Sequence, residues 1–150
     1  MSESFRQAAG RKVVSRATAQ QLGTVSHLLV TADGRRVAAV VMGKGKKASL
    51  VDWSQLTGFG TDAVMVGDEA ALRQPADARE HAAAEGKLEL IGRRLLSESG
   101  NELGTVDDVT FDPASGALEA LHGGAHQVAA DAVLGAGSYA VVVAASAGAV

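Results

Sequence analysis

The sequence predicts an all-β protein made of two small β-barrels in tandem, joined by a short helical connector. Three observations predict it: an internal duplication, short runs rich in Val and Leu between Gly-containing turns, and one Ala-rich stretch between the copies. The 150-residue chain is 47% hydrophobic, which is enough to fill a core. Because only 3% of the residues are aromatic, Val, Leu and Ala have to fill it.

The internal duplication keeps its order along the chain. The segment GRKVVS at residues 10–15 corresponds to GRRLLS at residues 92–97, and LGTV at residues 22–25 is repeated unchanged at residues 103–106. A fixed order of matched segments is the sequence signature of a repeated structural unit. Each copy is therefore expected to form one unit of the same fold.

The later matches locate the length differences between the copies. Residues 63–66 correspond to residues 140–143 at a smaller offset, so the second copy is shorter between its third and fourth strands. Asp33-Gly34 aligns with Ser115-Gly116, and Pro113 is interpreted as a one-residue insertion. The predicted division is a first barrel at residues 1–73, a helical connector at residues 74–88 and a second barrel at residues 89–150.

In the first copy, short apolar runs alternate with turn signals, as strands of small all-β proteins do. The Asp33-Gly34 pair predicts a hairpin turn, because such turns need positive φ angles. Residues 53–60 are expected to form a turn or one helical turn before the last strand. The predicted strands of this copy are residues 12–15, 24–31, 36–42, 48–52 and 63–66.

The second copy repeats the pattern with equally short strands. Strands this short cannot bury a face in a flat sheet, whereas a sheet that curls into a barrel buries its apolar face and removes its exposed edges. The predicted strands of this copy are residues 94–97, 105–112, 117–122, 127–129 and 139–144.

The connector between the copies, residues 77–85, is rich in Ala, Glu and Arg, which are strong helix formers. Asp77 is expected to be its N-cap, and Gly86 the residue that ends it. Its Ala-rich face is expected to pack on a barrel rather than to face solvent.

Charge is divided unevenly between the two halves. Residues 1–73 carry ten Lys and Arg against six Asp and Glu, a net charge of +4, whereas residues 74–150 carry four against eleven, a net charge of −7. Such asymmetry suggests that the halves face different partners or each other, and drift between duplicated copies is the alternative. The chain has no Cys, which excludes disulfides and thiolate metal sites.

Two segments of the sequence indicate where in the cell the protein is expected. The first residues lack a basic segment followed by an apolar run, so no signal peptide is expected. Residues 128–150 are largely apolar, but Asp131, Gly135 and Gly137 interrupt them, and a membrane-spanning helix needs about 20 apolar residues. We therefore expect no membrane insertion and a cytoplasmic location.

The order of these motifs resembles that of the PRC-barrel domain, named for the cytoplasmic barrel of the photosynthetic reaction-centre H subunit. The resemblance rests on the Gly-Arg/Lys-apolar strand, on Leu-Gly-Thr-Val before the long strand, and on Val51-Asp52-Trp53 and Asp62-Ala63-Val64. It covers residues 10–66 well. It covers residues 92–143 less well, because the second copy lacks the Trp and has Tyr139 in place of Asp62.

The resemblance implies two PRC-type, SH3-like β-barrels whose known family roles are binding and assembly, without catalytic residues. The same module forms the C-terminal half of a bacterial ribosome maturation factor for the small subunit. The sequence contains neither the N-terminal membrane helix of the reaction-centre subunit nor the separate N-terminal domain of that factor. Neither specific role is therefore expected to carry over.

Basic side chains gather at two expected hairpin tips, Arg35-Arg36 and the segment with Lys44, Lys46 and Lys47. Clustered cations of this kind can contact RNA phosphates or an acidic protein surface, and a solvated loop is the alternative. No aromatic platform accompanies them, which argues against sequence-specific recognition of single strands. Trp53 is expected to plug the mouth of the barrel, with partner contact as the alternative.

Other polar side chains favour structural interpretations. His122 and His126, with Asp131 nearby, offer too few converging ligands for a metal, so a hairpin turn is preferred. His27 is expected on a strand face, partly buried. Because small barrels have filled interiors, the carboxylates of the second copy are expected to form a charged surface rather than a catalytic pair. They are Glu98, Glu102, Asp107, Asp108 and Asp112.

The sequence therefore favours a non-catalytic protein-interaction or assembly module with no enzyme activity, cofactor or metal. A protein partner or self-association is expected, and DNA is not. The alternative is an RNA- or ribosome-associated maturation factor that uses the basic loops, and an enzyme with a cleft between the barrels is the least favoured hypothesis. The predicted contact residues are Arg35, Arg36, Lys44, Lys46, Lys47 and Trp53.

Overall fold

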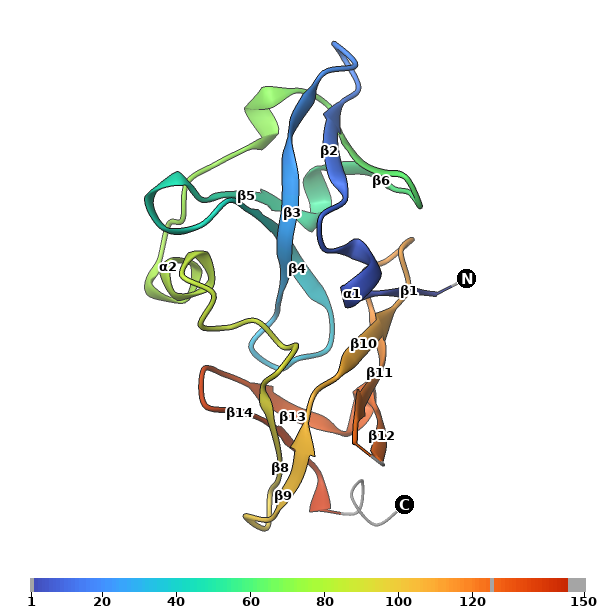
Figure 1. Ribbon diagram of the computed structural model, residues 1–150, viewed down its shortest axis with the longest axis vertical. Helices are drawn as coiled ribbons and strands as arrows, with labels where there is room; N and C mark the ends of the chain where they lie inside the picture. Colours follow the sequence, from blue (N-terminus) through green and yellow to red (C-terminus); the bar gives the residue numbers. More distant parts are fainter. Residues whose placement is uncertain (1, 125, 146–150) are drawn as a thin grey trace.

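The computed structural model describes residues 2–124 and 126–145, which form two small β-barrels that follow each other along the longest axis of the molecule (Figure 1). In this described part, fourteen strands are accompanied by only two α-helices and four 3₁₀ helices. The all-β tandem fold predicted from the sequence is therefore confirmed. Helix α2 lies beside the first barrel (Figure 1).

The first barrel is one curled sheet of six strands in the order β5-β4-β3-β2-β7-β6. Strand β7 runs parallel to β2, and the other neighbouring pairs are antiparallel. The long strand β3 pairs with β2 at its start and with β4 further on, so it links the two sides of the barrel. The strands are β2 (Lys12–Ser15), β3 (Gln21–Val30), β4 (Val37–Met42), β5 (Ser49–Asp52), β6 (Leu56–Phe59) and β7 (Ala63–Val66).

The second barrel consists of two four-stranded sheets, β13-β14-β8-β9 and β1-β10-β11-β12. Strands β9 and β10 together take the place of β3. Strand β1 (Glu3–Ser4) comes from the start of the chain. The remaining strands are β8 (Arg94–Ser97), β9 (Glu102–Thr105), β10 (Asp108–Phe111), β11 (Leu118–Gly123), β12 (His126–Ala129), β13 (Val133–Ala136) and β14 (Ala140–Val143).

The strand registers of the two copies are the same. Lys12 pairs with Ala63 in the parallel β2–β7 ladder, and Arg94 pairs with Ala140 in the parallel β8–β14 ladder. Bulges also recur, between β2 and β3 as between β8 and β9, and between β6 and β7 as between β13 and β14. Because bulges are specific features of a fold, the duplication is confirmed at the level of individual hydrogen-bonded pairs.

The single strand predicted at residues 105–112 is wrong, because the chain changes partner there. The N–H of Val106 donates to the carbonyl of Arg93 beside β8, whereas the N–H of Asp107 donates to His122 of β11. Strand β3 makes the same change through a bulge at Ser26 and stays continuous. The second copy breaks at this point into β9 and β10.

The one-residue insertion inferred at Pro113 is also wrong. Val30 pairs with Val37 across the first hairpin, and Phe111 pairs with Leu118 across the second, so both tips contain six residues. The glycines of the two tips simply occupy different positions. Equivalent residues from β3 to β4 and from β9 to β11 therefore differ by a constant 81 in number.

Residues 53–60, predicted as a turn or one helical turn, contain a strand as well. The 3₁₀ helix η2 (Trp53–Gln55) is followed at once by β6, and in the second copy η4 (Ala130–Ala132) is followed by β13. Strands β6 and β13 are edge strands of their sheets. The two barrels meet beside these edge strands.

The connector forms helix α2 (Ala78–Ala84), as predicted. The carboxylate of Asp77 accepts a hydrogen bond from the N–H of Glu80 at 2.8 Å, and Gly86 has a φ of +82°. Ala83 and Ala84 are buried. Ala83 packs on the outer face of the first barrel, in a cluster with Leu29, Ala39, Val41, Leu50 and Leu88.

The start of the chain ties the two copies together. Strand β1 pairs with β10 of the second copy, with Glu3 opposite Phe111, and helix α1 (Phe5–Ala8) buries Phe5. One cluster of buried side chains runs through both copies, from Val13 and Val40 to Leu95 and Leu121. The two barrels therefore share one core, although the sequence-based boundaries at residues 73 and 89 stay a prediction.

The apolar C-terminal region forms strands in its described part. Residues 126–143 contain β12, η4, β13 and β14, and the rest of residues 128–150 lies partly outside the described residues. Within residues 2–124 and 126–145, no helix has both the length and the apolar character needed to cross a membrane.

Candidate functional site

The two barrels meet at the tips of two equivalent hairpins, residues 31–36 and residues 112–117. Arg36 and Ala117 form an antiparallel bridge there. The N–H of Val37 donates to the carbonyl of Gly116 at 2.8 Å, and the N–H of Leu118 donates to the carbonyl of Arg35 at 2.9 Å. These two bonds join equivalent positions in opposite directions, so the tips are related by a local two-fold axis.

The first tip covers the edge of the second barrel. The N–H of Ala136 in β13 donates to the carbonyl of Ala32 at 3.0 Å. Gly34 is buried against Val133, because a Cβ added to this glycine would lie 2.6 Å from the Cγ1 of Val133. The guanidinium of Arg35 donates to the carbonyls of Asp131 and Val133, both at 3.3 Å. The edge of β13 is therefore already covered by a hairpin turn of the same chain, through one backbone hydrogen bond and the contacts of Gly34 and Arg35.

The second tip does not cover the edge of the first barrel in the same way. Gly116 lies on the indole of Trp53, since an added Cβ would be 2.8 Å from its Cε2. Phe59 is the equivalent of Ala136, and within the described residues its N–H makes no bond to the tip. Trp53 stands where the second copy has Ala130, and these larger side chains hold the tip away from β6.

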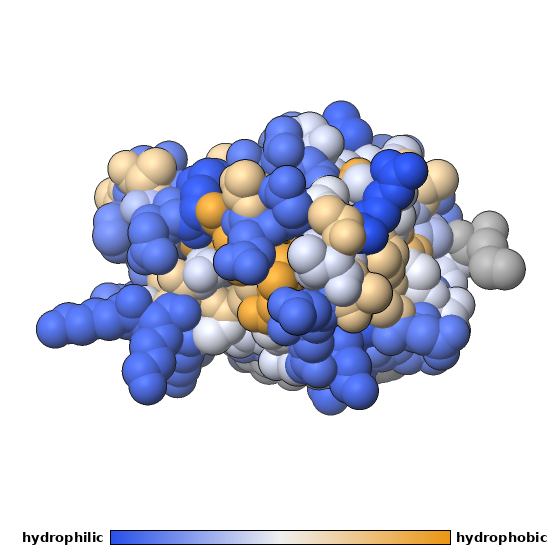
Figure 2. Space-filling model, turned by 90° about the horizontal axis from the view of Figure 1, so that it is seen from above, coloured by the Kyte–Doolittle hydropathy of each residue, from blue (hydrophilic) through white to orange (hydrophobic). Residues whose placement is uncertain are grey.

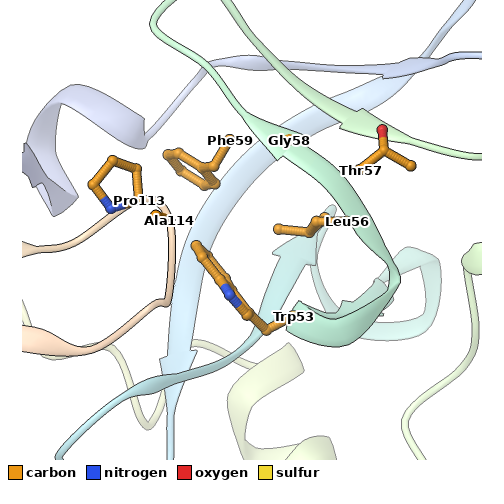
Figure 3. Close-up of a pocket in the computed structure, with 7 residues that line it drawn as sticks. All are labelled: Trp53, Leu56, Thr57, Gly58, Phe59, Pro113 and Ala114. Carbon is orange, nitrogen blue, oxygen red and sulfur yellow. The ribbon is translucent and has the colours of Figure 1, made fainter.

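The result is an open groove of about 420 Å³ between β6 and the second tip (Figure 3). In Figure 3, Trp53, Leu56 and Phe59 face Pro113 and Ala114 across this space, and Thr57 points away from it. We call it the seam groove. It is lined by Trp53, Leu56, Thr57, Gly58, Phe59, Pro113 and Ala114.

The Trp and Phe side chains of the protein gather behind the seam groove. Trp53 stacks on Phe59 with ring centroids 5.5 Å apart, and Phe59 meets Phe111 edge to face at 5.3 Å. Phe5 of α1 packs on Phe111 at 5.5 Å. The only Trp and all three Phe thus form one cluster, which gives the groove a rigid apolar wall.

A buried arginine supports this wall from the other side. The guanidinium of Arg11 lies 5.3 Å from the ring centre of Phe59, donates to the carbonyl of Gly60 at 2.8 Å and pairs with Glu3 at 3.0 Å. Glu3 belongs to β1, which in turn pairs with the second barrel. The position of Phe59 therefore depends on both barrels.

Two of the predicted contact residues lie at the hairpin tip but bond to the second copy. The guanidinium of Arg35 donates to Asp131 and Val133, and that of Arg36 donates to the carbonyl of Ser115 at 2.9 Å. Both arginines are nevertheless exposed to solvent. Their contact with a partner stays a prediction.

The predicted lysines lie elsewhere on the first barrel. Lys44, Lys46 and Lys47 surround the 3₁₀ helix η1 (Gly45–Lys47), are exposed, and pair with no carboxylate in the described part of the chain. Figure 2, which views the molecule from above, shows hydrophilic side chains standing out around a more apolar centre. Strand β5 separates these lysines from Trp53, so the structure does not bring the six predicted residues together.

The other polar candidates take structural positions. The carboxylate of Asp107 accepts from the N–H of Gly124 at 3.0 Å, and that of Asp112 accepts from the N–H of Ala114 at 2.9 Å. His27 is buried on β3, and its Nε2 has no hydrogen-bond partner among the residues that the structure describes. Among residues 2–124 and 126–145, no three His, Asp or Glu side chains gather in a way that could hold a metal ion.

Of the seam groove, the sequence predicts only Trp53 as a contact residue. Gly58 and Phe59 fall in a predicted turn, and Pro113 falls in a predicted insertion. The one available signal was the pair of large residues in the first copy, Trp53 and Phe59, opposite the small Ala130 and Ala136 of the second copy.

Two barrels with the same registers, sharing one core and meeting across a two-fold junction, define a tandem small-barrel protein. A comparison with protein-family models matches the PRC-barrel domain over residues 3–72 and 88–126, and thus within both copies. The chain belongs to the PRC-barrel domain family, as its motifs predicted. A search of curated proteins found no match.

Proposed function

We propose that this PRC-barrel protein is a non-catalytic protein-interaction or assembly module and that the seam groove is its contact surface. The observation that supports the proposal is an apolar, aromatic-walled groove that runs along the edge of an exposed strand. Surfaces that bind proteins are enriched in aromatic side chains and depleted in charge at their centre. Of the contact residues predicted from the sequence, Trp53 belongs to this surface.

The lining of the groove favours binding over catalysis. Its seven residues are Trp, Leu, Thr, Gly, Phe, Pro and Ala, and none of these side chains titrates near neutral pH. General acid–base catalysis requires a titratable group within hydrogen-bond reach of the reacting atom. A groove of this composition supplies apolar area and backbone hydrogen-bonding groups instead.

The proposal is tested by affinity capture from the native cell with the wild type and with Gly58→Lys. Gly58 is exposed, and a Cβ added there meets nothing within 4 Å, so the fold should accept the change while a charge enters the groove. Gly67→Lys is the matched control, because Gly67 is equally open but lies outside the groove. We expect specific partners to be lost at least tenfold with Gly58→Lys alone. Equal capture by all three proteins would contradict the proposal.

A second candidate function rests on the exposed lysines. Lys44, Lys46 and Lys47 lie within one short loop without carboxylate partners in the described residues, an arrangement that suits RNA phosphates. An RNA- or ribosome-associated factor would co-sediment with small ribosomal subunits, and binding would weaken steeply with salt. Replacing all three lysines by Glu would then abolish co-sedimentation, whereas Gly58→Lys would leave it unchanged.

A further inference from the structure

We infer that the seam groove receives an extended segment of a partner protein, which adds to the open edge of β6 as a further strand. The inference rests on the proposed function and names the kind of ligand. It comes from the local two-fold relation of the barrels, because the equivalent edge, β13, is already occupied in the same molecule.

The occupied edge shows how such a segment is held. At β13, the bound segment is the hairpin tip at residues 31–36. Its carbonyl at Ala32 accepts from the N–H of Ala136, its Gly34 packs on Val133, and its Arg35 donates to two backbone carbonyls. Because residues 32–35 form a turn, the tip uses only one backbone bond to this edge among the described residues. An extended peptide can bond along more of such an edge, with side chains bound at alternate positions.

The open edge presents the same backbone groups. The β6–β7 and β13–β14 pairs have the same register and bulge, and Gly60 and Gly137 make the same bond to Ala63 and Ala140. The N–H of Phe59 is therefore directed outward, as the N–H of Ala136 is. A Cβ at Gly135 would lie 3.9 Å from the carbonyl oxygen of Ala32, so its equivalent, Gly58, faces the place of the incoming segment.

The groove differs from the occupied edge in size and in its walls. The tip places only the small Gly34 against β13, whereas the seam groove leaves about 420 Å³ between Trp53, Phe59 and Pro113. An apolar side chain fits this space, because no charged group lines it to compensate a buried charge. The groove is continuous with the interface between the barrels, since Pro113 and Ala114 belong to the second tip.

The occupied edge of β13 also indicates the order of side chains in the ligand. In the tip, Gly34 packs on β13 and Arg35 reaches the backbone carbonyls of Asp131 and Val133, whose counterparts at the open edge are Ser54 and Leu56. Gly34 and Arg35 are adjacent because the tip is a turn, whereas in an extended peptide alternate residues share a face. The expected ligand is thus an extended peptide with an aliphatic residue or proline that enters the groove and Lys or Arg two residues away.

The test is selection of phage-displayed random octapeptides on the whole protein, followed by binding of the selected peptides in solution. Trp53 is the only Trp, so its fluorescence reports occupation of the groove. We expect enriched peptides to carry the apolar-basic pair and to change Trp53 fluorescence. On binding, amide exchange of Phe59 should slow at least tenfold, whereas Ala136, which is bonded in the free protein, should not change.

Two variants and one control make the test decisive. Gly58→Lys blocks the groove from β6, and Ala114→Lys, at an exposed position, blocks it from the tip. Each should weaken peptide binding at least tenfold, whereas Gly67→Lys should bind as the wild type does. No enrichment, or peptides that bind the blocked variants equally, would overturn the inference.

The outcomes also separate this inference from the proposed function. Affinity capture that depends on Gly58, without peptide binding, would mean that the groove holds a folded surface and that the extended-strand inference is wrong. A concentration-dependent dimer that Gly58→Lys abolishes would identify a second copy of this chain as the occupant and would equally overturn it.

Discussion

Among the single residues, two histidines, His27 and His126, have a buried ring nitrogen without a hydrogen-bond partner in the described part of the chain. His27 lies on β3 beneath the end of α2 and is only 8% exposed. Burial lowers the pKa of the His27 imidazole below its ordinary value, although the nearby carboxylate of Glu89 opposes the shift. The folded protein therefore holds this group neutral where an unfolded chain would protonate it.

This imidazole makes stability depend on pH. Because the pKa is lowered on folding, the unfolded state binds the extra proton first, so the free energy of unfolding falls as pH drops below about 6.5. The slope is at most about 1.4 kcal/mol per pH unit. Urea unfolding of the wild type and of His27→Leu between pH 7.5 and 5.5 measures it. His27→Leu should flatten the dependence, and an unchanged slope would contradict the assignment.

At the scale of elements, α2 is held to the first barrel by a three-residue ion network. The guanidinium of Arg73 pairs with Glu80 of α2 at 2.6 Å and with Asp52 at the end of β5 at 2.7 Å. Hydrogen bonding to Arg73 lowers the pKa of Glu80 to about 2. The backbone of Arg73 also bonds to Leu50 of β5, so the network reinforces a connection that the backbone already makes.

Removing this network should weaken the attachment of α2 to the first barrel. Since the pKa of Glu80 is lowered on folding, its contribution is present above the ordinary value of 4.5 and is lost as pH falls toward 2. At pH 7, Glu80→Gln should lower the free energy of unfolding by about 1 kcal/mol. Glu85→Gln is the control, because the Glu85–Lys87 pair is exposed. Urea unfolding of both variants measures the difference, and equal losses would show that the network does not anchor α2.

At the scale of the whole molecule, the two barrels behave as halves of one folded unit. Their hairpin tips exchange backbone hydrogen bonds, β1 of the first copy joins a sheet of the second, and one buried cluster spans both. The first tip seals its edge with Gly34, whereas the second tip rests on Trp53 and leaves the seam groove. The asymmetry of the junction is thus produced by side-chain size on an almost symmetric backbone.

A substitution at Gly34 tests whether the two barrels unfold together. Gly34→Ala places a Cβ 2.6 Å from Val133 Cγ1 at a φ of +71° and should destabilise the protein by about 2 kcal/mol. Gly10→Ala is the matched control, because its φ is +84° but nothing lies within 4 Å. Although Val133 belongs to the second barrel, the urea midpoint reported by Trp53 in the first barrel should fall together with the circular dichroism. Separate midpoints would show that the barrels unfold independently.

Local signals along the chain were enough to predict the duplication, most strands and the connector helix. Alternating apolar residues, turn glycines and the Asp77 and Gly86 caps act over a few neighbours, whatever the rest of the chain does. The same signals carried the family resemblance, since its motifs lie at turns and strand starts.

Which strands form the sheet edges, and which of these edges is open, depends on contacts between distant parts of the chain. Strand β6, with the sequence LTGF, has no pattern that separates it from a turn, and β1 forms only because β10 lies beside it in space. The seam groove follows from Trp53 and Phe59 standing opposite Ala130 and Ala136 across a two-fold axis. Such an axis arises from contacts distant in sequence, which local patterns do not encode.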